Sequence, residues 1–99
     1  MAELSVIISE LNSKAEELNA LNQQFYNQVG TLEETEGALN GMWEGEARTQ
    51  FHTAFTNDVT QMHNFYNAVA MYVQVLINAV EKYQIAESRN VDVATTRRY

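Results

Sequence analysis

Histidine is the residue type here that most often serves in acid–base catalysis or metal binding, and the chain has two, His52 and His63. They are eleven residues apart, which on one helix separates them by about 16 Å along the axis, too far to share a metal ion. Neither lies in an HExxH motif. The chain has no cysteine, which excludes disulfides, thiol catalysis and thiolate metal sites. The sequence therefore predicts no metal site and no cofactor.

Adjacent carboxylates occur at Glu16 and Glu17 and again at Glu33 and Glu34. Neighbouring residues on a helix point in different directions, so these pairs indicate a solvated acidic face and not the facing carboxylates of a hydrolase. The sequence also has no Gly-rich phosphate loop, and a narrow helical protein offers no obvious substrate cleft. We therefore predict a protein that is not an enzyme.

Composition points to one small helical domain with few and long elements. The 99 residues are 45% hydrophobic, contain no proline and only four glycines, and carry a net charge of -7. Residues 1–46 hold nine acids against one base. The sequence has no basic patch that would bind nucleic acid or an anionic membrane surface at neutral pH. It does not decide whether the protein interacts with membranes in another way. The first eleven residues lack the basic segment of a secretory signal peptide, and no stretch approaches the ~20 apolar residues of a membrane span.

The first half of the chain has the apolar spacing of a helix that packs along its length against another helix. Steps of four and three select twelve positions, ten of them apolar, and the column at sevens from Leu4 to Leu39 is uniformly Leu or Phe. This pattern predicts a helix over about residues 4–40, roughly 55 Å long. The twelve positions are Leu4, Ile8, Leu11, Ala15, Leu18, Asn22, Phe25, Val29, Leu32, Glu36, Leu39 and Trp43.

The second half repeats the pattern and adds flanking aromatic residues, so its apolar face is broader than the first helix can cover. A second copy of the hairpin is the expected cover, giving an all-α four-helix bundle, with a heterodimer as the alternative. The residues predicted to form the hairpin and dimer interface are Phe51, Phe55, Val59, Met62, Phe65, Tyr66, Val69, Tyr72, Val73 and Leu76.

The break between the two patterns predicts a tight turn over about residues 41–45, so the two helices must run antiparallel. Gly41 is expected to end the first helix in the left-handed conformation, and Gly45 to free the backbone before a second helix over about 46–87. Trp43 has two compatible roles, as the last apolar position of the first helix or as a lid over the end of the helix pair. Residues 88–99 are polar and predict a flexible tail after a single hairpin domain, 1–87.

A chain of about one hundred residues, with a W-x-G triplet at Trp43 and Gly45 between two long amphipathic helices, resembles the WXG100 or ESAT-6-like family over its whole length. The resemblance implies a helical hairpin that dimerises into a four-helix bundle. It also implies folding in the cytoplasm and export, without a cleaved signal peptide, through a type VII (ESX) secretion system of a Gram-positive or mycobacterial-type bacterium.

The family's export signal is a Tyr followed four residues later by Asp or Glu, and Tyr83 and Glu87 match it. Four residues apart on a helix places both side chains on one face, where the secretion ATPase could bind them together. The structural alternative is that Tyr83 is the last core residue and Glu87 a solvated acid.

Two non-enzymatic functions follow from the resemblance. In the first, the protein is itself an exported type VII substrate. In the second, it is an adaptor whose broad apolar face pairs with the helical domain of a larger exported toxin.

Overall fold

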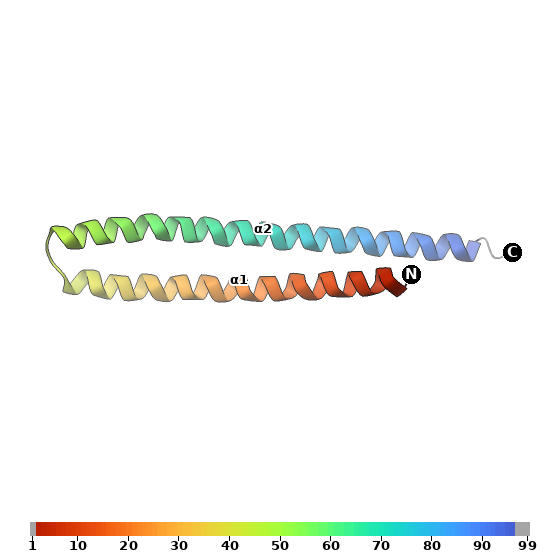
Figure 1. Ribbon diagram of the computed structural model, residues 1–99, viewed down its shortest axis with the longest axis horizontal. Helices are drawn as coiled ribbons and strands as arrows, with labels where there is room; N and C mark the ends of the chain where they lie inside the picture. The colour runs from red at the N-terminus through yellow and green to blue at the C-terminus, as the bar shows by residue number, and fades with distance from the viewer. Residues whose placement is uncertain (1, 97–99) are drawn as a thin grey trace.

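The computed structural model describes residues 2–96 as two long helices, α1 (Ala2–Met42) and α2 (Glu46–Thr96), joined by a turn at residues 43–45. The helices lie side by side in opposite directions and form a rod of 84 × 16 × 14 Å (Figure 1). The predicted all-helical antiparallel hairpin is confirmed. Within the described residues, neither helix has a stretch apolar enough and long enough to cross a membrane.

The contact between the helices is formed by a column of residues spaced by seven on α1. Its members Ile8, Ala15, Asn22, Val29 and Glu36 are all buried. The predicted period of 3.5 is therefore correct, but the most buried column is not the column of Leu and Phe. Apart from Glu36, these side chains are small, β-branched or short and polar, so they fit between the two helices, and the larger Leu and Phe side chains lie on the flank.

The Leu and Phe column lies on one flank of this contact and is only partly covered. Leu4, Leu11, Leu18 and Phe25 are half-buried, and the later members Leu32 and Leu39 are exposed. On α2 the buried residues are Val69, Val73 and Val80. Within one hairpin, each helix therefore buries only part of its apolar face, and the adjacent part of that face remains exposed to solvent.

Asn22 fixes how the two helices are aligned at mid-length. Its side-chain amide is buried, and Nδ2 donates a hydrogen bond of 3.1 Å to the backbone carbonyl of Tyr66. Beside it, the rings of Phe25 and Phe65 meet edge to face with centroids 5.5 Å apart. A buried polar group is stabilised only where its partner is in reach, so the Asn22 contact favours this alignment over shifted ones.

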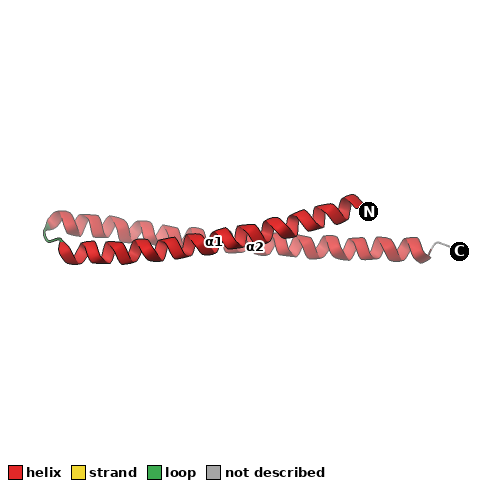
Figure 2. Ribbon diagram, turned by 90° about the horizontal axis from the view of Figure 1, so that it is seen from below, coloured by secondary structure: helices red, strands yellow, loops and turns green. Residues whose placement is uncertain are grey.

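The helix ends differ from those predicted. Gly41 lies inside α1, so its expected left-handed role is wrong, and the residue with a positive φ, 117°, is Gly45. At the other end α2 continues to Thr96, past the expected end at residue 87, and extends beyond the start of α1 (Figure 2). Residues 88–96 contain neither Gly nor Pro, so nothing in their backbone chemistry stops the helix. Residues 97–99 of the expected tail lie outside the described part of the chain.

Gly45→Ala is expected to lower the free energy of unfolding by about 1–3 kcal/mol, because a side chain at φ 117° is strained even though no atom lies within 4 Å of the added Cβ. Gly41→Ala is the matched control. Gly41 is helical and equally free of neighbours, so alanine there is expected to raise stability by up to about 1 kcal/mol. Urea unfolding of both variants at one protein concentration measures the difference, and equal changes would contradict the assigned role of Gly45.

Candidate functional site

The W-x-G triplet forms the closed end of the hairpin. Trp43 directly follows α1 and is half-buried, with its ring centroid 5.8 Å from that of Phe51 in the second turn of α2. Phe51 in turn stacks on Phe55 with centroids 6.4 Å apart. The indole therefore packs across the turn onto α2, as a lid over one flank of the helix pair.

Trp43→Ala is expected to lower the free energy of unfolding by about 2 kcal/mol, less than the loss of a fully buried Trp, because the indole is half-buried. Helix content should be retained, since the helices are held by the column that begins with Ile8. Met42→Ala, one residue earlier, is the control, because that side chain is 85% exposed and its loss should change stability by less than about 0.5 kcal/mol. Thermal and urea unfolding compare the two, and equal stability losses would contradict packing of the indole.

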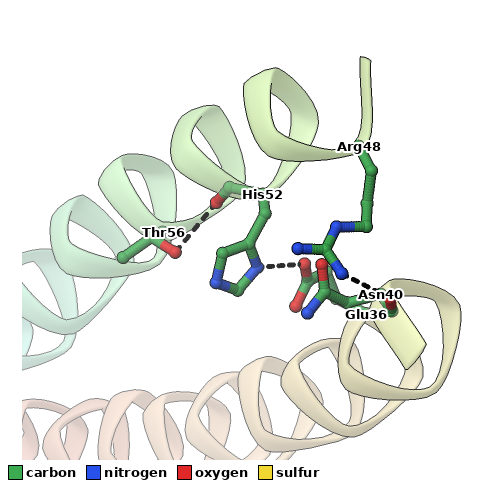
Figure 3. A network of polar contacts seen from close by, with 5 residues as sticks. All are labelled: Glu36, Asn40, Arg48, His52 and Thr56. Atoms are coloured by element: carbon green, nitrogen blue, oxygen red, sulfur yellow. Dashed lines mark hydrogen bonds and ion pairs between the residues drawn. The ribbon is translucent and has the colours of Figure 1, made fainter. Parts of the chain in front are cut away.

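A polar network lies near the same end of the hairpin, on the buried side of α1 (Figure 3). Glu36 is 8% exposed, and its Oε1 lies 2.5 Å from Nδ1 of His52. Arg48 Nη1 donates to the backbone carbonyl of Asn40 at 3.5 Å, and Thr56 Oγ1 donates to the carbonyl of His52 at 2.8 Å. A buried carboxylate is stabilised only when a polar or charged partner lies close, and His52 is that partner for Glu36. The contacts of Glu36 with His52 and of Asn40 with Arg48 connect the end of α1 to the start of α2.

The second histidine makes a similar contact three turns further along α2. Nε2 of His63 lies 2.9 Å from Oε1 of Glu33, so each histidine pairs with a glutamate of the other helix. In the described residues no three His, Cys, Asp or Glu side chains gather where they could hold a metal ion.

These pairs are the feature that sequence reasoning missed, since it placed Glu33 on a solvated face. In the sequence, Glu36 precedes Glu44 by as many residues as His52 follows it. An antiparallel hairpin with its turn at Glu44 therefore places these two side chains level with each other, and their contact can be anticipated from the position of the turn. Both pairs are suited to holding the helices together, and all four of their side chains line one open pocket of about 360 Å³.

One flank of the hairpin carries large apolar side chains that the described part of the chain leaves 41–59% exposed. We call it the open stripe and define it as Leu21, Leu32, Leu39, Phe51, Phe65 and Tyr72. Phe65 and Tyr72 are 57% and 59% exposed, and the contact between Phe65 and Phe25 joins the α1 and α2 parts of the stripe. The opposite flank holds the His63–Glu33 pair and Tyr26, so it is the more polar of the two.

The residues predicted for the interface divide into two groups. Val69 and Val73 are buried against α1, and Phe55, Val59, Met62, Tyr66 and Leu76 are half-buried there. Phe51, Phe65 and Tyr72 are exposed in the hairpin and belong to the open stripe.

The Tyr83 and Glu87 pair lies at the open end of the hairpin, opposite the turn. Tyr83 is 44% exposed, whereas Glu87 is half-buried and accepts a hydrogen bond from Oγ of Ser5 in α1. Up to residue 89, the last position of α2 whose burial is described, Val80 and not Tyr83 is the last buried apolar residue. The exposed ring of Tyr83 differs from the core position that the structural alternative gives it, and Glu87 contacts Ser5 of α1.

Comparison with known proteins gives one finding. The family model described as WXG100, proteins of 100 residues with WXG, matches residues 3–88, which include the turn and the Tyr83 and Glu87 pair. No curated protein and no solved structure matches the chain significantly.

Proposed function

Because the chain belongs to the WXG100 family, the ESAT-6-like family of type VII secretion substrates, we propose that it is exported through a type VII secretion system as a folded helical-hairpin dimer. Proteins of this family are small helical proteins and not enzymes, and they typically dimerise. The observation that carries the proposal is the family match itself, because it spans the hairpin, the W-x-G turn and the candidate export signal together.

Tyr83 and Glu87 are proposed to form the export signal that the secretion ATPase binds. The exposed ring of Tyr83 supports this assignment, because an aromatic side chain on a rigid helix can bury a large area in a partner at little entropic cost. Glu87 supplies a carboxylate one turn further on the same face of α2.

The open stripe supports the dimer. Six large apolar side chains on one flank are more than a monomeric hairpin of this size normally leaves in contact with water, and a second hairpin laid on that flank would enclose them.

The same stripe also favours a second candidate function, that of an adaptor. A helical domain of a larger exported toxin could occupy the stripe in place of a second copy, and the chain would then carry that partner to the ATPase.

Secretion from a type VII-competent bacterium, compared with a strain that lacks the secretion ATPase, tests the proposal. We expect the protein in the culture medium of the first strain and only inside the cells of the second. Light scattering on the purified chain should give the mass of a dimer. Export that needs a co-expressed larger partner would favour the adaptor, and export from the ATPase-deficient strain would contradict both functions.

A further inference from the structure

We propose that the outer face of α2 docks an acidic amphipathic helix of another protein, at a surface separate from the open stripe. This face lies in the C-terminal half of α2 and points away from α1, and we call it the outer seam. The inference goes beyond the proposed export and dimer, because neither of them uses this face. The residues of the outer seam are Ala68, Met71, Val75, Asn78, Lys82, Ile85 and Arg89.

The outer seam lies opposite the contact between the two helices. Met71 and Val75 are two residues before and two residues after the buried Val73. Two residues correspond to a rotation of about 200° on a helix, so both side chains point away from α1. The next two residues of the seam stand in the same relation to the buried Val80. Within the described chain, no other element lies on that side of α2 (Figure 1).

The apolar part of the outer seam is open to water. Met71 is 69% exposed and Val75 is 64% exposed, the highest values among the large apolar side chains described in α2, and Ile85 is 53% exposed. The seam residues follow one another in alternating steps of three and four, the spacing with which one helix packs along another. A partner helix laid on the seam would bury these side chains over a length of about 30 Å.

The charge of the outer seam selects an acidic partner. Lys82 and Arg89 are both exposed and lie seven residues apart, on either side of Ile85. The chain has six Lys and Arg against thirteen acids, so two bases on one short face reverse its overall charge locally. Glu81 and Glu87, the acids nearest to them in the sequence, lie off the seam, and Glu87 contacts α1. Carboxylates seven residues apart on a partner helix would therefore meet both bases.

A second copy of the chain does not supply this partner. Its acidic candidate is α1, where Glu10 and Glu17 are exposed and are also seven residues apart. Antiparallel pairing of these acids with the two bases of the seam places Gln24 opposite Val75, which covers an apolar side chain with an amide. Parallel pairing places Glu3 there instead, and the seam before that point extends beyond the start of α1. The partner is therefore another protein, with an apolar residue at this position.

A synthetic helical peptide of about 22 residues, the length of the outer seam, tests the docking chemistry on the full chain. The peptide carries Leu at the positions that face the apolar members of the seam and Glu at the two positions that face its bases. It is made in both sequence directions, to cover antiparallel and parallel docking. We expect the better direction to bind at least about tenfold more tightly than the same peptide with Lys in place of the two Glu, by fluorescence anisotropy at low salt. Equal binding of the two peptides, or binding of neither, would overturn the inference.

Two matched variants locate the peptide on α2. Met71→Asp is expected to weaken binding of the Glu peptide at least about tenfold, because it places a carboxylate in the apolar part of the outer seam. Ala70→Asp is the control, since it adds the same charge at an exposed position about 100° round the helix, and it should bind as wild type does. Normal binding by Met71→Asp, or equal losses in both variants, would contradict docking on the seam.

Charge reversal tests the pairing with the two bases. A chain that carries both Lys82→Glu and Arg89→Glu is expected to bind the Lys peptide more tightly than the Glu peptide, the reverse of the wild-type preference. An unchanged preference for the Glu peptide would show that these bases do not select the partner. Vesicles of phosphatidylglycerol are the second probe. If the wild-type chain binds them and not the Glu peptide, and the reversed chain does not bind them, the seam is a membrane surface and the inference is wrong.

Self-association separates this inference from the proposed dimer. Met71→Asp should self-associate as wild type does in sedimentation velocity, because Met71 lies outside the open stripe. Phe65→Asp, a change in the open stripe, should still bind the Glu peptide. Loss of the dimer in Met71→Asp would place Met71 in the dimer interface, and loss of peptide binding in a helical Phe65→Asp would place the peptide on the open stripe. Either result would overturn a separate docking surface, whereas a monomeric wild type that binds the Glu peptide on the seam would contradict the dimer alone.

Discussion

Replacement of Tyr83 by alanine is expected to reduce export at least about tenfold while the protein still accumulates, folded, inside the cell. The ring is 44% exposed and lies beyond Val80, the last buried apolar residue in the part of α2 up to residue 89, so its removal should cost the hairpin little packing. A tyrosine that anchors a binding surface commonly contributes 2 kcal/mol or more to the complex. The ratio of secreted to cellular protein measures the effect, with thermal unfolding and light scattering of the purified variant beside it.

Glu87 needs a different design, because its carboxylate also accepts a hydrogen bond from Ser5. Glu87→Gln removes the charge and keeps an acceptor for that hydroxyl, whereas Ser5→Ala removes the contact and keeps the charge. If the ATPase binds the carboxylate, Glu87→Gln should lose export and Ser5→Ala should keep it. The reverse result would mean that Glu87 acts by anchoring the start of α1. Normal export of both Tyr83→Ala and Glu87→Gln would remove the pair as a signal.

The hairpin was predictable from the sequence because it depends on features that act locally. A spacing of 3.5 residues, two long apolar patterns and one glycine-containing break leave an antiparallel helix pair as the simplest arrangement. The spacing of the apolar residues does not determine which of two adjacent columns on α1 packs against α2. Asn22 and Glu36 look like interruptions of the apolar pattern, yet they lie in the most buried column. Their partners, the Tyr66 carbonyl and His52, are on the other helix and are known only once the helices are aligned.

The second helix shows a different limit of sequence reading. The end of this helix was predicted at residue 87 because the apolar pattern stops there. That pattern indicates which residues are buried, and it does not determine where the helical backbone ends. A segment without Gly or Pro can continue an existing helix at little cost, since each added residue contributes a backbone hydrogen bond. At the turn, Gly41 and Gly45 were both able to take a positive φ, and only the conformation of the chain distinguishes them. For the candidate site, the sequence suggested Tyr83 and Glu87 as a signal, and the alternative that Tyr83 is a core residue does not agree with its 44% exposed ring.

Phe65→Asp is expected to raise the dissociation constant of the proposed dimer at least about a hundredfold, roughly 3 kcal/mol. The change replaces a ring of the open stripe, 57% exposed in the hairpin, with a carboxylate that would lose its water on dimerisation. Asn64→Asp is the matched control, because it adds the same charge one residue earlier, at an exposed position that points away from the stripe. Sedimentation velocity over a range of concentrations measures self-association of both.

Phe65 also meets Phe25 within the hairpin, so circular dichroism must establish that Phe65→Asp is a helical monomer and not an unfolded chain. Partial loss of stability is expected, because one edge-to-face ring pair is lost, whereas the buried column from Ile8 to Glu36 is untouched. A Phe65→Asp protein that is helical and as dimeric as wild type would show that the open stripe is not the surface through which two copies associate. Loss of the dimer in Asn64→Asp as well would point to net charge as the cause. If Phe65→Asp is a helical monomer and Asn64→Asp is a dimer, the interface lies on the open stripe. Both variants add one negative charge, but they add it on different faces of α2.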